Sequence, residues 1–192
     1  MKATFALLAD TETHNLVRKL AWDIHRKYRT GIEVCRLPPH VSLKQPFDIS
    51  DLTALEVYMD ELASSIKPFE VSLSQLHLVK ATIGNLETGI LWLDVEETET
   101  LRQLHNRINR ELALRFGDTQ ASFDGASYRF HMTVAMGGQP FDVYRAIYEE
   151  YSATPIDLRY IAREIALFIY DDNANLDRGY IIYKVLPVCE RP

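Results

Sequence analysis

The sequence predicts an α+β fold of two pseudo-symmetric lobes, with mostly antiparallel sheets flanked by helices and a central cleft. One observation behind this is that the order strand, helix, short strand, helix, strand occurs twice along the 192 residues. The other is that each copy contains a short apolar strand in which a histidine is followed two residues later by a hydroxyl residue. Long linkers and low-complexity tracts are absent, so we expect residues 1–192 to form a single bilobal domain.

The first copy is predicted from hydrophobic spacing and from Pro and Gly positions. Its expected elements are a strand over 2–9, a helix over 15–28, a strand or loop over 32–37, a short strand from 40, a helix over 52–66 and a strand over 69–79. Thr11 or Thr13 can cap the first helix, which Gly31 ends, and Ser50 or Asp51 can cap the second. Two prolines before His40 force an extended entry into the short strand.

The second copy repeats this plan and continues beyond it. Its expected elements are a strand over 89–95, a helix over 97–116, a polar loop over 117–125, a short strand over 130–135, a helix over 141–151, a mostly strand segment over 156–170, a hairpin loop over 171–178 and a final strand over 179–186. Gly137-Gly138 and Pro140 break the short strand before the helix that follows it.

Composition limits the class of protein. The hydrophobic content of 47% is that of an ordinary globular chain. The sequence contains neither an apolar run of the roughly 18 residues that a membrane span needs nor a convincing signal peptide, so we expect a cytoplasmic protein. The two cysteines form neither a disulfide framework nor a Cys-x-x-Cys metal pattern. A net charge of −6 argues against a surface that coats long nucleic acid, but it leaves room for a small nucleotide in a local basic pocket.

The two short strands carry the chemistry. Residues two apart in a strand point to the same face, so His40 and Ser42 share one face, and His131 and Thr133 share another. The apolar residues between them face the core. A His-x-Ser/Thr triplet is common by chance, but two copies at the same place in a repeated plan are not. Two such faces on one cleft can hold a phosphate and move protons on both sides of it.

These stretches, Pro-His-Val-Ser-Leu and Phe-His-Met-Thr-Val, resemble the paired motifs of the 2H phosphoesterase superfamily, which includes the 2′-5′ RNA ligases and the cyclic phosphodiesterases. The resemblance implies that His40 and His131 are the catalytic pair and that Ser42 and Thr133 bind phosphate. Serine replaces the commoner threonine at position 42 and keeps the hydroxyl. The implied activity is a phosphoric diester hydrolase that acts on a nucleotide or RNA 2′,3′-cyclic phosphate end, without a cofactor or metal.

Two cations extend these faces. Because side chains two apart in a strand share a face, we expect Lys44 on the face of His40 and Ser42, and Arg129 on the face of His131 and Thr133. Either cation can then supply charge to a phosphodiester. Tyr128 and Phe130 fall on the opposite face and are expected in the core.

Two other interpretations of the same residues stay open. A metal-dependent hydrolase could use His40 and His131 as ligands, with His77 as a possible third, although the strands supply hydroxyls and not carboxylates. Alternatively, a non-catalytic nucleotide- or RNA-binding module could have kept the cleft. The sequence does not assign acid and base to individual histidines, the bond cleaved, hydrolysis or ligation, or the oligomeric state.

Overall fold

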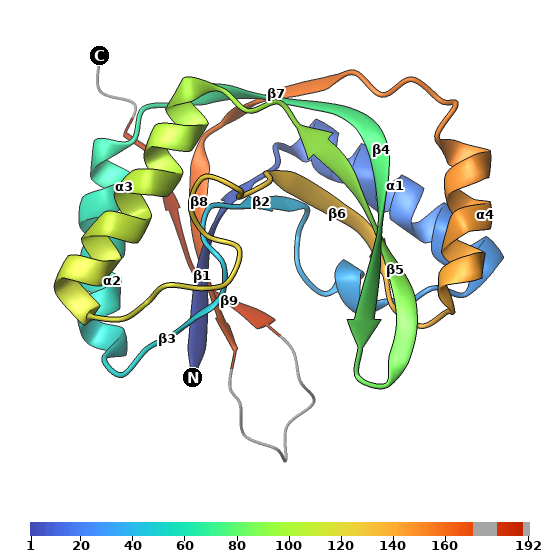
Figure 1. Cartoon of the computed structure of the whole chain (residues 1–192). Coiled ribbons are helices and arrows are strands. Elements are labelled where there is room, and N and C mark those ends of the chain that lie inside the picture. The colour runs from blue at the N-terminus through green and yellow to red at the C-terminus, as the bar shows by residue number, and fades with distance from the viewer. Residues whose placement is uncertain (171–179, 190–192) are drawn as a thin grey trace.

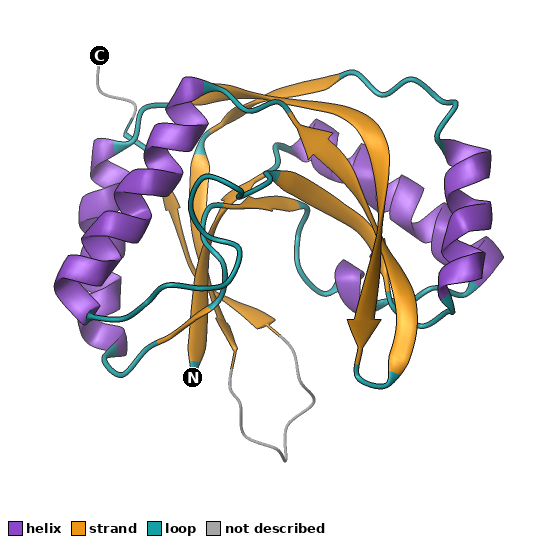
Figure 2. Ribbon diagram, viewed as in Figure 1, coloured by secondary structure: helices purple, strands orange, loops and turns teal. Residues whose placement is uncertain are grey.

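The computed structural model of the chain describes residues 1–170 and 180–189, so the hairpin loop predicted over 171–178 lies outside the described residues. Figures 1 and 2 show the arrangement of its helices and strands. In chain order these are β1 (Lys2–Leu8), α1 (Thr11–Tyr28), a 3₁₀ turn (Glu33–Cys35), β2 (His40–Ser42), β3 (Phe47–Asp48), α2 (Leu52–Ser65), β4 (Phe69–Ile83), β5 (Leu86–Val95), α3 (Glu99–Phe116), β6 (His131–Met136), α4 (Phe141–Tyr151), β7 (Leu158–Ala162), β8 (Glu164–Tyr170) and β9 (Tyr180–Pro187).

The strands form two antiparallel sheets, which confirms the predicted α+β class. The first sheet has the order β2-β1-β8-β9, with β3 also paired to β1. The second has the order β6-β5-β4-β7. Each signature strand, β2 or β6, therefore lies at one edge of its sheet, beside the strand that begins its half of the chain.

Each sheet is covered by one helix from the first half of the chain and one from the second, which is a crossed packing. Helices α2 and α3 pack on the first sheet, where Tyr58 of α2 meets Phe5 of β1 edge to face with ring centroids 5.7 Å apart. Helices α1 and α4 lie on the second sheet, on the other side of the molecule (Figure 1). There the Tyr144 ring of α4 sits so close to Gly89 of β5 that a Cβ at Gly89 would come within 2.3 Å of it. Each half of the chain thus contributes to both lobes.

The first helix begins four residues earlier than the sequence predicts, at Thr11 rather than at 15, and ends at Tyr28 as predicted. It begins at Thr11 because the Asp10 side chain, and not a threonine, accepts a hydrogen bond from the Thr13 backbone N–H at 2.8 Å. It ends before Gly31, since Arg29 adopts the left-handed conformation with φ of 58°. The second helix is capped by Asp51, one of its two predicted caps.

The segment 156–170, predicted as mostly strand, is two strands in different sheets. Strand β7 pairs with β4 in the second sheet, whereas β8 pairs with β1 in the first. Arg163 is the single residue between them. Exposed and buried positions alternate at the end of β7, whereas five consecutive residues of β8 are buried, but neither pattern specifies which sheet a segment joins.

Strands β4 and β5 are longer than predicted and form a hairpin. They pair from Leu73 with Val95 to Ile83 with Leu86, and a two-residue turn of Gly84 and Asn85 connects them. Gly84 has a φ of 61°, the conformation that such tight turns require of their first residue. The segment 32–37, expected as strand or loop, contains the 3₁₀ turn.

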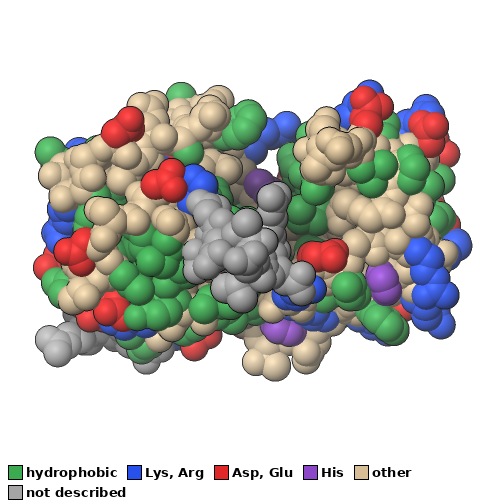
Figure 3. Space-filling view, turned by 90° about the horizontal axis from the view of Figure 1, so that it is seen from below, with side chains coloured by type: hydrophobic (Ala, Val, Ile, Leu, Met, Phe, Trp, Pro, Cys, Tyr) green, Lys and Arg blue, Asp and Glu red, His purple; other side chains and the backbone are tan. Residues whose placement is uncertain are grey.

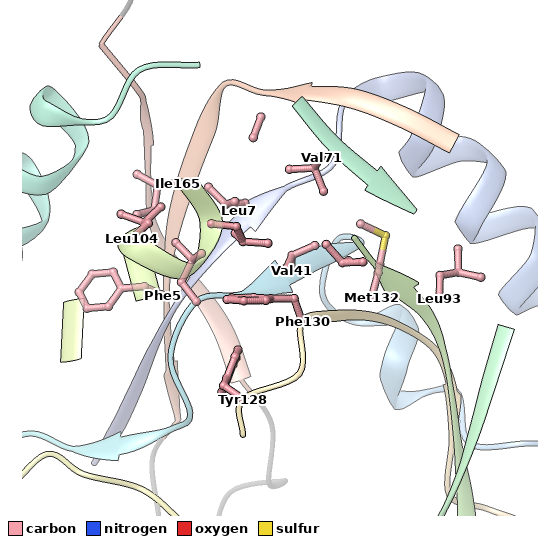
Figure 4. Close-up of a cluster of buried hydrophobic side chains, with 14 of the residues drawn as sticks. Phe5, Leu7, Val41, Val71, Leu93, Leu104, Tyr128, Phe130, Met132 and Ile165 are labelled. Atoms are coloured by element: carbon pink, nitrogen blue, oxygen red, sulfur yellow. The ribbon is translucent and has the colours of Figure 1, made fainter. Parts of the chain in front are cut away.

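One cluster of buried apolar side chains extends through both lobes. Val41 of β2 and Met132 of β6 belong to it, together with Leu7 and Phe130, and Figure 4 shows these side chains between the two sheets. The apolar member of each signature is therefore fixed in the core. Among the described residues, the structure contains no helix long and apolar enough to cross a membrane.

Candidate active site

Strand β2 presents its signature as the sequence predicts. Val41 is fully buried, whereas His40 and Ser42 on the opposite face are half-buried. Antiparallel pairing with β1 holds the strand in register, with His40 beside Leu8 and Ser42 beside Ala6. The imidazole and the hydroxyl of this signature thus share one face of the first sheet.

Strand β6 does the same in the second sheet. His131 and Thr133 are half-buried, and the residues between and after them, Met132 and Val134, are fully buried. Pairing with β5 sets His131 beside Asp94 and Thr133 beside Trp92. The second imidazole therefore has an aromatic and an acidic neighbour that the first signature lacks at the corresponding register positions.

The two signature strands lie against each other although they belong to different sheets. Strands β2 and β6 are in contact, and the Tyr128 hydroxyl donates a hydrogen bond to the Ser42 carbonyl at 2.9 Å. Tyr128 and Phe130 are buried, at 2% and 4% exposure, which confirms their prediction as core residues. Seen from below, the surface is hollowed between the two lobes, and a histidine side chain is visible in the hollow (Figure 3).

Each of the two imidazoles is hydrogen-bonded to the backbone carbonyl two residues before it. Nδ1 of His40 lies 2.8 Å from the Pro38 carbonyl, and Nδ1 of His131 lies 2.8 Å from the Arg129 carbonyl. A carbonyl oxygen can only accept, so Nδ1 carries the proton in both rings. In each neutral histidine Nε2 is then left as the nitrogen that can take up a proton, and both rings are set for acid–base chemistry at the same atom.

His40 lies in an apolar, electropositive place. The ring of Phe168, which is fully buried, meets the imidazole edge to face with centroids 4.7 Å apart. Burial lowers the pKa of His40 from 6.5 to about 4, and the positive charges of His131 and Arg18 act in the same direction, while the hydrogen bond to Pro38 opposes them. The influence of His131 on this pKa shows that the two histidines are within electrostatic range.

His131 has a different environment, which sequence reasoning missed. Its ring stacks on Trp92 with centroids 4.4 Å apart and an interplanar angle of 28°. Burial lowers the pKa of His131, and Arg129 adds to that, but the hydrogen bond to the Arg129 carbonyl and the charge of Asp94 raise it. Trp92 and Asp94 lie two apart on one strand, so their common face was a signal available in the sequence.

The prediction that Lys44 faces the substrate is wrong. Its side chain is 0% exposed and forms an ion pair with Asp124, while its Nζ donates to the Thr119 carbonyl at 2.8 Å. The regular strand ends at Ser42, so the alternation that placed Lys44 beside it does not continue. The Lys44 carbonyl accepts a hydrogen bond from the Thr4 hydroxyl, which fixes the bend.

The role of Arg129 toward a substrate stays a prediction. This residue precedes β6, is exposed, and its positive charge is felt by His131. His77, considered above as a metal ligand, stacks on the other side of Trp92 with centroids 5.4 Å apart. In the described part of the chain, no group of three or more His, Cys, Asp or Glu side chains is arranged to hold a metal ion.

Comparison with known proteins identifies the family. The model of the 2′-5′ RNA ligase superfamily matches residues 11–174. The chain therefore belongs to this superfamily, the 2H phosphoesterases. Relatives from Staphylococcus aureus strains Newman and JH1, described as candidate phosphoesterases, are 27% identical over 155 residues, which is 80% of this chain and 83% of theirs.

Solved structures share the fold. The structure of E. coli LigT complexed with NADP+ matches with a TM-score of 0.58 and 16% identity, over 98% of each chain. TT0787 of Thermus thermophilus matches with a TM-score of 0.56 and 15% identity over 100% of each chain. LigT complexed with 3′-AMP matches with a TM-score of 0.55 and 16% identity, over 98% of each chain.

Proposed function

We propose that this chain is a metal-independent phosphoesterase that opens the 2′,3′-cyclic phosphate of a nucleotide or RNA end. The observation that carries the proposal is the pairing of two imidazoles on adjoining strands, each with Nδ1 held by its own backbone and Nε2 left for proton transfer. Membership of the superfamily and the nucleotides bound by LigT, 3′-AMP, ATP and NADP+, support a nucleotide substrate.

The reaction needs two proton transfers on opposite sides of the phosphorus. The neutral Nε2 of one histidine takes a proton from water as the oxygen bonds to phosphorus. The protonated Nε2 of the other gives its proton to the ribose oxygen as the P–O bond breaks. The product is a phosphate monoester, and the two histidines exchange protons with solvent before the next cycle.

The hydroxyls of Ser42 and Thr133 donate hydrogen bonds to the non-bridging oxygens, where charge develops. Arg129, exposed beside β6, adds a positive charge for the same phosphate or a second one. The acidic chain as a whole, with a net charge of −6, favours a small nucleotide or an RNA terminus over long RNA.

The test is turnover of adenosine 2′,3′-cyclic phosphate, followed by chromatography of the monophosphates, with and without EDTA. We expect the parent protein to be active in EDTA, and His40→Ala and His131→Ala each to lose about 10²–10⁴ in rate. The matched control is His25→Gln, which changes an imidazole on α1 that bonds the Thr30 carbonyl.

Three outcomes would contradict the proposal. Activity abolished by EDTA and restored by Zn²⁺ or Mn²⁺ would establish the metal-dependent alternative. Binding of nucleotides without turnover of any cyclic phosphate would establish a binding module. Near-parental turnover by a correctly folded His131→Ala protein would exclude the two-histidine mechanism.

A further inference from the structure

We propose that Tyr128 is a positioning residue for Ser42: its hydroxyl holds the end of β2 from outside the sheet, and so aims the Ser42 hydroxyl at the phosphate. This inference rests on the proposed function, because it concerns a hydroxyl to which that function gives the phosphate. Tyr128 bonds the backbone of the first signature, so its effect on the reaction passes through Ser42.

Strand β2 is short and has a free edge. It has three residues and lies at the end of its sheet, with β1 as its neighbour. The Leu43 N–H donates to the Phe5 carbonyl at 2.8 Å, on the side of the strand that faces β1. The backbone groups of successive residues in an antiparallel strand point to alternate sides, so the Ser42 carbonyl points to the free edge. The ladder with β1 therefore leaves this carbonyl to another partner.

The Tyr128 hydroxyl is that partner. It donates to the Ser42 carbonyl at 2.9 Å, and Tyr128 is so deeply buried that water does not compete for the bond. Tyr128 lies three residues before His131, in the segment that enters β6 (Figure 4). A shift of the Ser42 peptide would carry the Ser42 hydroxyl with it. One hydrogen bond thus ties the hydroxyl residue of the first signature to the strand that carries the second.

His105 of α3 supports this bond from the side. Its Nδ1 lies 2.8 Å from the Leu43 carbonyl, and the Gly125 N–H lies 3.1 Å from its Nε2. A carbonyl can only accept and an N–H can only donate, so His105 is neutral with its proton on Nδ1. Its fully buried ring stacks on Tyr128 with centroids 4.2 Å apart. Two consecutive carbonyls, those of Ser42 and Leu43, are therefore held by two stacked rings.

The backbone of Tyr128 is anchored by Arg102 of α3. The guanidinium donates to the Tyr128 carbonyl and to the Gly125 carbonyl, each at 2.7 Å. It also binds both carboxylate oxygens of Glu97, at 2.8 and 2.6 Å. The tyrosine is thus fixed at its backbone by Arg102 and at its ring by His105. Because Tyr128 cannot follow a movement of β2, its hydroxyl sets the position of the Ser42 carbonyl.

The experiment is a double-mutant cycle on kcat/KM for adenosine 2′,3′-cyclic phosphate. Tyr128→Phe removes the hydroxyl and keeps the ring that stacks on His105. We expect this variant to lose about tenfold in the parent protein. In a Ser42→Ala background it should lose less than about twofold, because its effect passes through the missing hydroxyl. In a Thr133→Ala background it should still lose about tenfold, since Ser42 is present there.

The matched control is Tyr144→Phe. The Tyr144 hydroxyl is also buried and donates to a backbone carbonyl, that of Gly137 at 2.7 Å, beyond the opposite end of β6. We expect Tyr144→Phe and Tyr128→Phe to lower the free energy of unfolding in urea to a similar extent, but only Tyr128→Phe to slow the reaction. Equal losses of rate in the two variants would mean that Tyr128 has a structural role alone.

A second readout needs no turnover. Inorganic phosphate is the probe, and its dissociation constant is measured by NMR titration. We expect Ser42→Ala and Tyr128→Phe each to weaken phosphate binding by about three- to tenfold, because each costs the phosphate one well-placed donor. The double variant should bind phosphate as Ser42→Ala does, and Tyr144→Phe should bind it as the parent does.

Failure of the inference is distinct from failure of the proposed function. If the parent protein cleaves no cyclic phosphate but the two substitutions are coupled in phosphate binding, the proposed function fails and the positioning role stands. If the parent cleaves the diester and the losses at Tyr128 and Ser42 multiply, or Tyr128→Phe keeps the parental rate, the positioning role is overturned. A parent that neither cleaves the diester nor binds phosphate overturns both.

Discussion

The two signature strands carry the same kind of His-x-Ser/Thr triplet, but the cations next to the triplets differ in their burial. Lys44, two residues after Ser42, is fully buried and paired with Asp124. Arg129, two residues before His131, is exposed at the start of β6. The loop over 117–125 contacts the residues that follow β2, where Asp124 also accepts a hydrogen bond from the Gln45 backbone N–H at 3.2 Å. Equal spacing in sequence therefore gave one structural cation and one candidate for substrate binding.

The largest expected effect is that of removing the histidine that each signature strand carries. His40→Ala and His131→Ala combined should be little worse than the poorer single variant, because groups that act as a unit are strongly non-additive. The measurement is kcat/KM on adenosine 2′,3′-cyclic phosphate, with folding checked by circular dichroism. Losses that multiply to about 10⁶ would mean that the two signatures act independently.

The next effect concerns the buried cation. Lys44→Met should lower the free energy of unfolding by about 3–5 kcal/mol, because it leaves the buried carboxylate of Asp124 unpaired. Urea titration measures it. Lys80→Met, which breaks an exposed pair with Glu87, is the control and should cost less than about 1 kcal/mol. A stable Lys44→Met protein with abolished turnover would mean that Lys44 serves the substrate after all.

Smaller effects are expected at the hydroxyls. Ser42→Ala and Thr133→Ala each remove one donor to the phosphate and leave the proton transfers intact, so we expect losses of about 10–10² in kcat/KM. Thr133→Ser and Ser42→Thr keep the hydroxyl and should stay near parental activity. A loss at one strand only would show that the phosphate is held asymmetrically.

The exposed cation should contribute least to the rate. Arg129→Ala is expected to raise KM by less than about tenfold with kcat nearly unchanged, since an exposed charge is screened by solvent. The effect should shrink as salt is added. Arg110→Ala, an exposed arginine on α3, is the matched control. Equal effects of the two variants would show that Arg129 acts only through net charge.

The contrast between the histidines also predicts how stability responds to pH. The pKa of His40 is about 4 in the folded protein against 6.5 for an unperturbed group, so between these values the unfolded chain binds a proton that the folded chain does not. The free energy of unfolding therefore suffers no loss from His40 above about pH 6.5, and it falls as the pH drops toward 4. His40→Ala should flatten this part of the curve in urea titrations at several pH values. If the slope of the free energy of unfolding against pH is unchanged in His40→Ala, groups other than His40 cause the pH dependence.

The sequence predicted local structure well where a periodic pattern was complete. The alternation in His40-Val41-Ser42 and in His131-Met132-Thr133 was confirmed because each strand buries one face. Lys44 was misplaced because the same period was extended past the end of β2. The cap of α1 was predicted at a threonine because the first strand was expected to run almost to Asp10, which instead satisfies the helix N–H groups.

Features that depend on pairing between distant strands could not be predicted from the sequence. The place of Trp92 and Asp94 beside His131 follows from the register of β5 on β6, which no local pattern specifies. The passage from β7 to β8 at Arg163 is likewise a matter of which neighbour each segment finds. The roles of Ser42, Thr133 and Arg129 toward a substrate stay predictions.

The crossed packing of helices on sheets has a consequence for folding. Strand β1 belongs to the first sheet, yet α1, which follows it directly, covers the second, and the buried cluster is continuous through both lobes. Neither lobe can bury its apolar face until residues from both halves of the chain are in place. We therefore expect the lobes to melt in one cooperative transition, and a chain cut between the two copies to regain structure only when its fragments are mixed.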